Sequence, residues 1–177
     1  VVDCETTYGS LAPAFTVRYL EFVYDDTPEN SFTGSLLYSC LYDTTDPLNR
    51  GAGTYDITVT GLESHNYEIT YVDGTLTVAK KDLTITANNH TIIYGDAATN
   101  NGVSYSGFVY EEDETVLTGE LVYSYTYDQT SRDTRNVGDY VISVSGLDSD
   151  NYEITYVDGT LTVAKKDINI EVVDCET

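Results

Sequence analysis

A long internal repeat constrains the architecture of this chain more than any other feature. Residues 66–82 read NYEITYVDGTLTVAKKD, and residues 151–167 read the same letter for letter, 85 positions later. The match continues upstream, where residues 53–62 correspond to residues 138–147. Because each copy of such a repeat is one structural unit, the sequence predicts two tandem domains that repeat every 85 residues.

A second periodicity links the two ends of the chain. Residues 1–6 read VVDCET, and residues 172–177 read VVDCET again, 171 positions later. Residues 167–171 also resemble residues 82–86, which open the second repeat. We therefore expect the chain to be a piece of a longer array whose period is 171 residues.

These matches set the expected domain boundaries. Repeat one covers residues 1–81 and lacks the strand segment that opens its equivalents. Repeat two covers residues 82–166, and residues 167–177 begin a next repeat. The lysine pairs that end each repeat leave almost no linker, which favours a stiff, extended rod over a flexible string.

Within a repeat, apolar residues alternate with polar ones, as in half-buried strands. Leu83, Ile85 and Ala87 alternate with threonines, and residues 121–127 and 140–144 show the same period of two. The chain has 17 Tyr and no Trp, and tyrosine and threonine pack well on a pleated surface. The sequence therefore predicts a mostly-β protein.

The end of each repeat has the pattern of a β-hairpin. Residues 152–157 and 160–164 flank Asp158-Gly159, a dipeptide suited to a type I′ turn. Residues 107–119 have room for a short helix or turn in the crossover. This order predicts two β-grasp-like domains in which the last strand lies beside the first. An immunoglobulin-like β-sandwich is the alternative.

Five short motifs of repeat two form a recognisable set: Tyr-Gly-Asp at 94–96, Gly-Phe-Val at 107–109, Leu-Thr-Gly at 117–119, Val-Gly-Asp-Tyr at 137–140 and the block at 151–163. Together they resemble the MBG-type (YGX) tandem repeats of bacterial cell-surface proteins and adhesins. Repeat one departs from this pattern with Tyr8-Gly9-Ser10 and with a crossover that contains Pro28. The resemblance implies arrays on secreted or cell-wall proteins and supplies no catalytic residues.

The net charge of −22 restricts the partners. Nucleic acid requires a basic face that releases counterions, and an anionic membrane would repel the chain. Strong acidity is typical of a soluble, non-adhesive surface. We expect neither nucleic-acid binding nor membrane insertion.

Residue patterns give no sign of an enzyme. His65 and His90 belong to no H-x-x-x-H or H-E-x-x-H spacing, and we expect both in exposed loops, His90 at a hairpin turn. A G-x-S-x-G nucleophile elbow is absent, as is a glycine-rich phosphate loop. We predict no catalytic, cofactor-binding or metal-ligating residues.

Acidic loops raise calcium as the alternative to having no cofactor. Residues 111–114, Asp25-Asp26 and residues 148–151 carry carboxylates, but position 159 is Gly where a calcium loop needs a bidentate Glu. We expect solvated carboxylates, with a calcium ion near Asp73 or Asp158 as the alternative.

The strand of repeat two that contains Tyr123, Tyr125 and Tyr127 places all three on the face that alternation assigns to the core. Tyrosine is also common in binding surfaces because it joins an apolar ring to a polar hydroxyl. We favour core packing over a carbohydrate or protein contact surface.

The cysteines suggest a cross-link. Cys4 and Cys175 are one position of the 171-residue period seen twice, which leaves Cys4 and Cys40 as a pair. In a secreted-looking chain an even pair predicts a disulfide, while two unpaired buried thiols are the alternative. Cys175 would then pair with the next repeat's equivalent of Cys40.

Residues 167–177 also carry the strand that repeat one lacks. Ile168, Ile170 and Val172 are apolar at alternate positions. Without such a strand, a domain would leave a sheet edge unpaired and a core groove open. The segment would complete the next repeat, either in a continuous polypeptide or by strand donation to another subunit. The continuous polypeptide is simpler because the VVDCET overlap extends past the strand.

The function that follows is structural. We expect an extracellular, non-catalytic segment of a bacterial filament, stalk or surface fibre, whose partners are copies of itself head to tail or further repeats of the same chain. The alternative is an adhesin module that contacts a host glycan, a mucin or another surface protein. Specificity would then reside in the loops at 43–52 and 128–137, which differ most between repeats.

Overall fold

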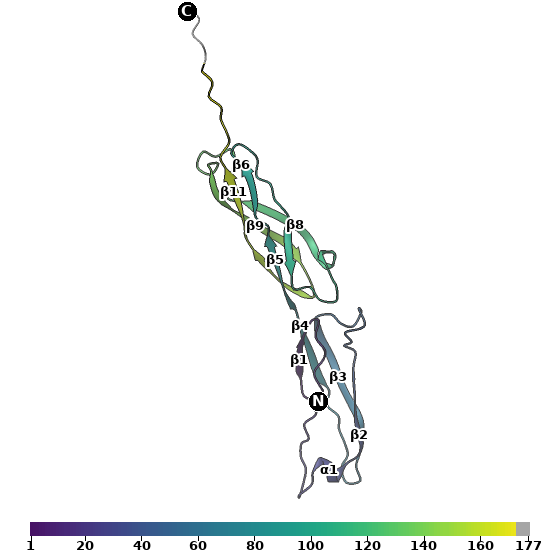
Figure 1. Cartoon of the computed structure of the whole chain (residues 1–177). Helices are drawn as coiled ribbons and strands as arrows, with labels where there is room; N and C mark the ends of the chain where they lie inside the picture. Colours follow the sequence, from purple (N-terminus) through teal and green to yellow (C-terminus); the bar gives the residue numbers. More distant parts are fainter. Residues whose placement is uncertain (173–177) are drawn as a thin grey trace, which may run out of the picture. The chain divides into compact units, whose positions relative to one another are not determined.

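The computed structural model describes residues 1–172, which form mostly strands joined by turns (Figure 1). The first repeat contains β1 (Cys4–Thr7), α1 (Pro28–Ser31), β2 (Thr33–Cys40), β3 (Gly53–Glu63) and β4 (Gly74–Ala79). The second contains β5 (Lys81–Ala87), β6 (His90–Ile93), β7 (Val103–Ser106), the 3-10 turn η1 (Glu114–Val116), β8 (Thr118–Tyr125), β9 (Gly138–Asp148), β10 (Tyr152–Val157) and β11 (Gly159–Ala164). The prediction of a mostly-β chain with tandem domains and a short helix or turn in each crossover is confirmed.

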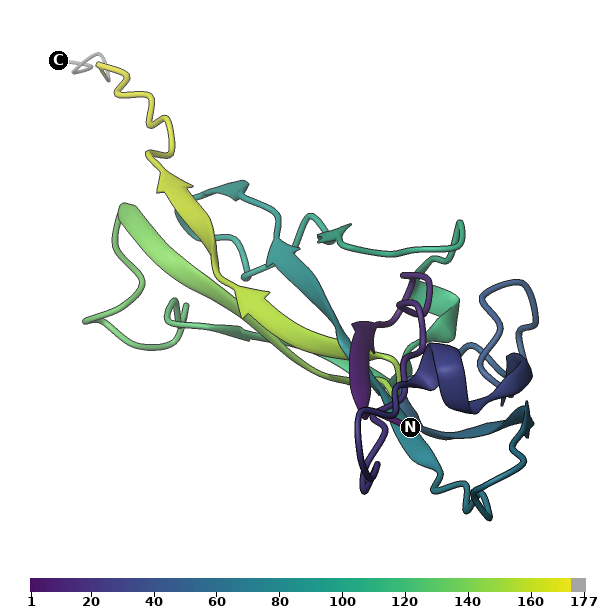
Figure 2. The same cartoon turned by 90° about the horizontal axis from the view of Figure 1, so that it is seen from below.

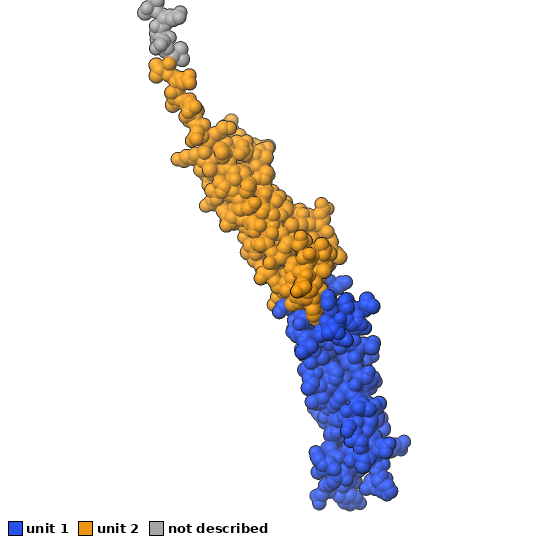
Figure 3. All heavy atoms as spheres, turned by 45° about the vertical axis from the view of Figure 1, so that its right-hand side comes forward, with its two compact units in different colours: residues 1–81, 150–153 blue, residues 82–149, 154–177 orange. Residues whose placement is uncertain are grey.

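The chain divides into two compact units. Unit 1 comprises Val1–Lys81 together with Asp150–Glu153, and unit 2 comprises Asp82–Ser149 and the residues from Ile154 onward (Figure 3). Four residues from the second repeat, including the start of β10, therefore belong to unit 1.

Each unit is built on a mixed four-stranded sheet. The order is β1-β4-β3-β2 in unit 1 and β6-β11-β9-β8 in unit 2. In both sheets the edge strand from the start of the repeat runs parallel to the last strand, and the remaining pairs are antiparallel. In unit 1 the last strand, β4, lies beside the first, β1, as expected. In unit 2 the last strand, β11, lies beside β6, while the first, β5, belongs to another sheet, so the expectation is wrong there. These pairings do not separate the β-grasp-like order from the immunoglobulin-like alternative.

Unit 2 has an additional sheet in which β5 lies between β10 and β7. Leu83, Ile85 and Ala87 on β5 are fully buried or nearly so. They pack into one core with the inward residues of β9 and β11, which are Ile142, Val144, Leu161 and Val163. The alternation read from the sequence therefore places the core correctly.

The hairpin expected at Asp158-Gly159 is wrong. β10 and β11 are separated by Asp158 alone and pair with different neighbours in different sheets. Gly159 does not have the positive φ that the turn needs. A Cβ at this position would lie 2.4 Å from the carbonyl oxygen of Ala87. Glycine is needed here for the close approach of β5.

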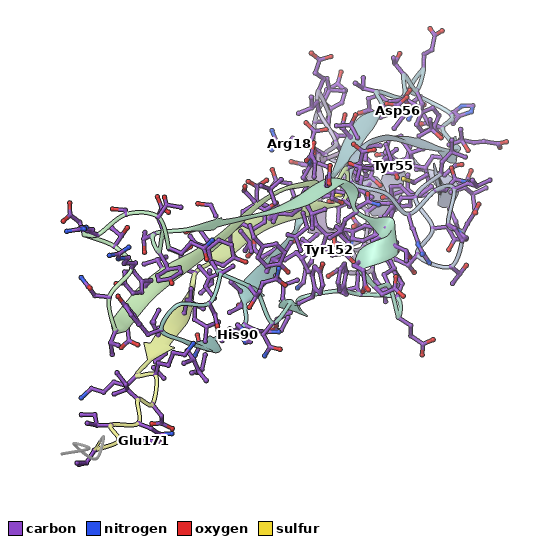
Figure 4. All side chains as sticks on the ribbon, turned by 90° about the horizontal axis from the view of Figure 1, so that it is seen from above. Arg18, Tyr55, Asp56, His90, Tyr152 and Glu171 are labelled. Atoms are coloured by element: carbon purple, nitrogen blue, oxygen red, sulfur yellow. The ribbon has the colours of Figure 1, made fainter. Side chains whose placement is uncertain are left out.

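His90 also lies elsewhere than expected. It opens β6 and pairs with Leu161 of β11, so it belongs to a sheet and not to a hairpin turn. His65 is in an exposed loop, as expected. Figure 4 labels His90 on its strand.

Candidate functional site

A groove of about 780 Å³ opens in unit 1. Its walls are residues 17–22 and residues 67–72, and its floor includes Val59 and Leu62 of β3. Neither wall is part of a regular strand. The groove is therefore bounded by two extended segments that do not pair with each other as a sheet.

The groove occupies the place that β5 fills in unit 2. Residues 67–72 are identical in sequence to β10, and residues 17–20 correspond to β7. In unit 2 these two strands flank β5 on either side. In unit 1 the segments that correspond to these two strands line the groove.

The first two residues of the chain close one end of the groove. The Val1 amino group donates to the carbonyl of Val72 at 2.6 Å, and the Val2 amide donates to the carbonyl of Thr16 at 2.9 Å. By alignment, Val1 takes the position of Ala87, the last residue of β5. The open space therefore corresponds to residues 82–86 of the second repeat.

An aromatic cluster closes the other end. Phe22 packs edge-to-face on Tyr67 with ring centroids 5.6 Å apart, and Tyr19 stacks on Phe32 at 5.6 Å. The Tyr67 hydroxyl donates to Asp26 at 2.5 Å, and this hydrogen bond raises its pKa. Burial raises the pKa of Tyr19 as well. These rings define an apolar end wall.

The residues expected to complete a next repeat are exposed in this chain. Ile168, Ile170 and Val172 are 85%, 89% and 93% exposed. The segment after β11 extends away from the strands of unit 2 (Figures 1 and 2), and Glu171 lies near its end (Figure 4). No regular structure is assigned to residues 165–172. None of the three side chains packs into the core of unit 2.

A second contact in unit 1 was not anticipated from the sequence. The rings of Tyr8 and Tyr152 meet edge-to-face with centroids 5.4 Å apart, and each residue is 2% exposed. The Lys81 amide donates to the Asn151 carbonyl at 3.0 Å. The Ala52 amide donates to the Asn151 side-chain oxygen at 2.9 Å. We call this arrangement the tyrosine seat.

In unit 2, no described residue packs over Tyr94 as Tyr152 packs over Tyr8 in unit 1. Tyr94 corresponds to Tyr8 and is 37% exposed. Lys166 corresponds to Lys81, and Val137 corresponds to Ala52. The sequence signal for this contact is the Asn-Tyr pair that recurs at 66–67 and 151–152. The sequence alone does not show that the turn at 150–153 packs in unit 1.

Both described cysteines are free thiols in this structure. Burial is the main cause that raises the pKa of Cys4, and the charge of a Cys40 thiolate adds to it. The Cys40 sulfur is thus close enough to affect the ionisation of Cys4. The disulfide between Cys4 and Cys40 stays a prediction, and Cys175 lies outside the described residues.

The acidic loops use their carboxylates locally. Asp113 accepts from the amide and hydroxyl of Thr115, and Asp128 does the same with Thr130. These hydrogen bonds lower the pKa of both carboxyls. Among the described residues, no group of three or more His, Cys, Asp or Glu side chains gathers in a way that could hold a metal ion.

The tyrosine-rich strand face is largely internal. Tyr123 and Tyr125 are half-buried, and Tyr127 is buried and donates its hydroxyl proton to the Asp96 carbonyl at 2.9 Å. The Tyr127 ring also packs edge-to-face on Tyr140. The interpretation of this face as core is therefore confirmed for Tyr127.

Comparison with protein families matches each of the two repeats separately. A family model described as the MBG domain (YGX type) matches residues 1–77 and again residues 83–162. The chain belongs to this family. The MBG domain is a structural repeat associated with cell-surface proteins and is not a known enzyme family. A comparison with curated proteins finds no match. Within the described part of these MBG repeats, no helix has the length and apolarity needed to cross a membrane.

Proposed function

We propose that the chain is a non-catalytic structural segment of an extracellular bacterial filament, stalk or surface fibre. The observation that carries this proposal is that equivalent polar side chains make the same internal bonds in both units. The Tyr42 hydroxyl donates to the Ser10 carbonyl at 2.6 Å, as Tyr127 does to Asp96. Tyr71 bonds to the backbone of Leu62 as Tyr156 does to Leu147.

Duplicated internal bonds favour a shaft because they use the tyrosines to hold the fold together. A dedicated binding module would more naturally keep a distinctive set of side chains free on one repeat. The net charge of −22 agrees with a role in which the lateral surface stays solvated and does not associate non-specifically.

Surface labelling of the producing cells tests this function. Antibodies raised against unit 2 should label intact cells, and electron microscopy should locate the label on fibres or stalks. Protease treatment of intact cells should remove the label, while a cytoplasmic marker protein should survive as the control. Label found only after lysis would contradict the proposal.

An adhesin role is the second candidate, and the loop at 43–52 favours it. This loop differs from its counterpart at 128–137 and holds Leu48 at 91% exposure. Glycan arrays and immobilised mucin would detect such binding. A variant in which residues 43–52 are replaced by residues 128–137 is the matched control, because it should keep the fold and lose the binding. Equal binding by both proteins would argue against this loop as the site.

A further inference from the structure

An Asn-Gly pair lies in unit 2, in the irregular segment between β6 and β7. Asn101 is the only asparagine of the chain that a glycine follows, and repeat one has Phe15-Thr16 at the equivalent positions. We propose that Asn101 is a site of spontaneous modification, at which the side-chain amide becomes a carboxylate through a cyclic imide formed with the Gly102 nitrogen. This inference is independent of the proposed structural function.

The conversion consumes water and uses no cofactor. The Gly102 amide loses its proton to hydroxide, and its nitrogen attacks Cγ of Asn101. The Cγ–Nδ2 bond breaks, and Nδ2 takes a proton from water and leaves as ammonia. Water then opens the ring at either carbonyl, which gives aspartate or, where the chain now runs through Cγ, isoaspartate. Because ammonia escapes into solvent, the converted fraction grows with the age of the chain.

Gly102 gives the attacking nitrogen an uncrowded approach. Its φ of +76° lies in the left-handed region, which glycine adopts at no steric cost. Apart from the adjoining residues, a Cβ added here would meet only Nδ2 of Asn88, at 3.9 Å. Asn101 is exposed, and residues 97–102 belong to no helix or strand. The reacting peptide is therefore outside the strands and accessible to water.

Asn88 stabilises the charge that develops during the attack. When Gly102 loses its amide proton, the negative charge is shared with the Asn101 carbonyl oxygen, because the peptide bond is delocalised. Nδ2 of Asn88 donates a hydrogen bond to that oxygen at 3.0 Å. The Ser104 hydroxyl donates to Oδ1 of Asn88 at 3.0 Å and holds the side chain in place. A fixed donor at an oxygen that gains charge lowers the barrier.

Two other hydrogen bonds restrain the reaction without blocking it. The Gly102 amide donates to Oδ1 of Asn100 at 3.1 Å, so the proton that must leave is held there. Nδ2 of Asn101, the leaving group, donates to the Asn89 carbonyl at 3.4 Å, which is long for a hydrogen bond of this kind. Asn100 and Asn101 are both exposed, so water can replace either bond.

The Asp-Gly pair at 158–159 shows why the surroundings matter as well as the two letters. Gly159 is buried, opens β11 and pairs with Ile142 of β9. The close approach of the Ala87 carbonyl leaves its backbone no freedom to bend toward the Asp158 side chain. A carboxylate is also a poorer electrophile than an amide. We therefore expect ring closure at Asn101 and not at Asp158.

The two products should affect the edge strand β7 differently. β7 lies beside β5, where Val103 pairs with Ala87. The next hydrogen bond runs from the Asn88 amide to the Gly102 carbonyl at 3.1 Å. Aspartate adds one negative charge and keeps the backbone path. Isoaspartate lengthens the path between residues 101 and 102, so the Gly102 carbonyl moves away from the Asn88 amide.

Timed incubation of the full-length chain in neutral buffer tests the site. Peptide mapping by mass spectrometry with electron-transfer fragmentation distinguishes aspartate from isoaspartate at each position. Asn101 should convert before any other asparagine and should give both products. The Asn88 amide should exchange faster in the isoaspartate form only. A peptide of residues 97–106 serves as the clock: an unchanged Asn101 in the chain after this peptide has converted would overturn the proposal, as would aspartate without isoaspartate.

Three variants test the assigned roles. Asn101→Gln should stop the conversion, because its longer side chain closes a ring poorly. Asn88→Ala should slow the reaction in the folded chain by roughly three- to tenfold, the effect of one lost hydrogen bond. It should leave the rate in denaturant unchanged, since the contact exists only in the fold. Asn100→Ala should speed the reaction. An Asn88→Ala chain that is folded and converts as fast as the unchanged chain would refute the role of Asn88.

Discussion

Gly159 shows how a single residue is fixed by the approach of another strand. Its backbone is extended, and the carbonyl of Ala87 comes within 2.4 Å of where a Cβ would be. At Gly74, the equivalent in repeat one, the nearest atoms belong to the side chain of Val1 at 2.9 Å. The same glycine therefore faces rigid backbone in one unit and the side chain of the first residue in the other.

Gly159→Ala should destabilise unit 2 by about 1–3 kcal/mol, the usual cost of overpacking a close contact. Gly74→Ala should cost less because its added Cβ would lie 2.9 Å from the nearest atom, against 2.4 Å at Gly159. Denaturant unfolding of each variant measures the difference. A larger loss for Gly74→Ala than for Gly159→Ala would contradict this account of the two sites.

Three buried or half-buried tyrosines make the stability of the folded chain depend on pH in the alkaline range. Burial is the main cause that raises the pKa of Tyr105, Tyr123 and Tyr127 in the folded chain. The unfolded chain loses these protons near the ordinary value of about 10. The stabilisation is therefore fully present below that pH and is lost as the pH rises through the raised, folded-state values.

In denaturant unfolding at increasing pH, the contribution of these tyrosines to the denaturant midpoint should stay constant near neutral pH. The midpoint should fall above about pH 10. Tyr127→Phe should flatten this fall relative to the unchanged chain, because it removes one titrating group. Its loss of the hydrogen bond to Asp96 should appear as an offset at every pH. A fall of equal steepness in both proteins would exclude Tyr127 as a contributor.

Cys4 and Cys40 should form a disulfide in an oxidising environment. The raised pKa of Cys4 keeps it mainly as the thiol near neutral pH, so oxidation should be slow without a catalyst. Mass spectrometry of non-reduced peptides from secreted material is the measurement. If both cysteines react with an alkylating reagent under native oxidising conditions, the cross-link is absent.

At the scale of elements, β5 and the segment after β11 form a natural pair for comparison. Leu83→Ala should destabilise unit 2 by about 2–5 kcal/mol, since it removes a fully buried side chain. Ile168→Ala, at the equivalent position, should leave the monomer unchanged because its side chain is 85% exposed. Denaturant unfolding of each variant separates the two. A comparable loss for both would mean that residues 167–171 already pack in the monomer.

Much of the element pattern could be predicted because it depends on local periodicity. The alternation at residues 83–87 predicted the buried face of β5. The hairpin at Asp158-Gly159 was wrong because the dipeptide preference is local, whereas the long-range approach of Ala87 decides the conformation. The tyrosine seat was missed because it depends on which unit residues 150–153 pack against.

The whole molecule should behave as one element of a linear array. A unit of 85 residues is roughly 30 Å across from the usual relation of size to length. Small-angle scattering on tandem proteins of two and four repeats should give a constant cross-section and a length that grows with repeat number. A compact globule with four repeats would contradict the shaft.

The first strand of unit 1, β1, lies beside the last, β4, and runs parallel to it. A force that pulls the two ends of this unit apart would therefore act on β1 and β4 in opposite directions. The hydrogen bonds between the two strands lie across that direction, so they would have to break together before the unit extends. This pairing suits a protein that carries mechanical load.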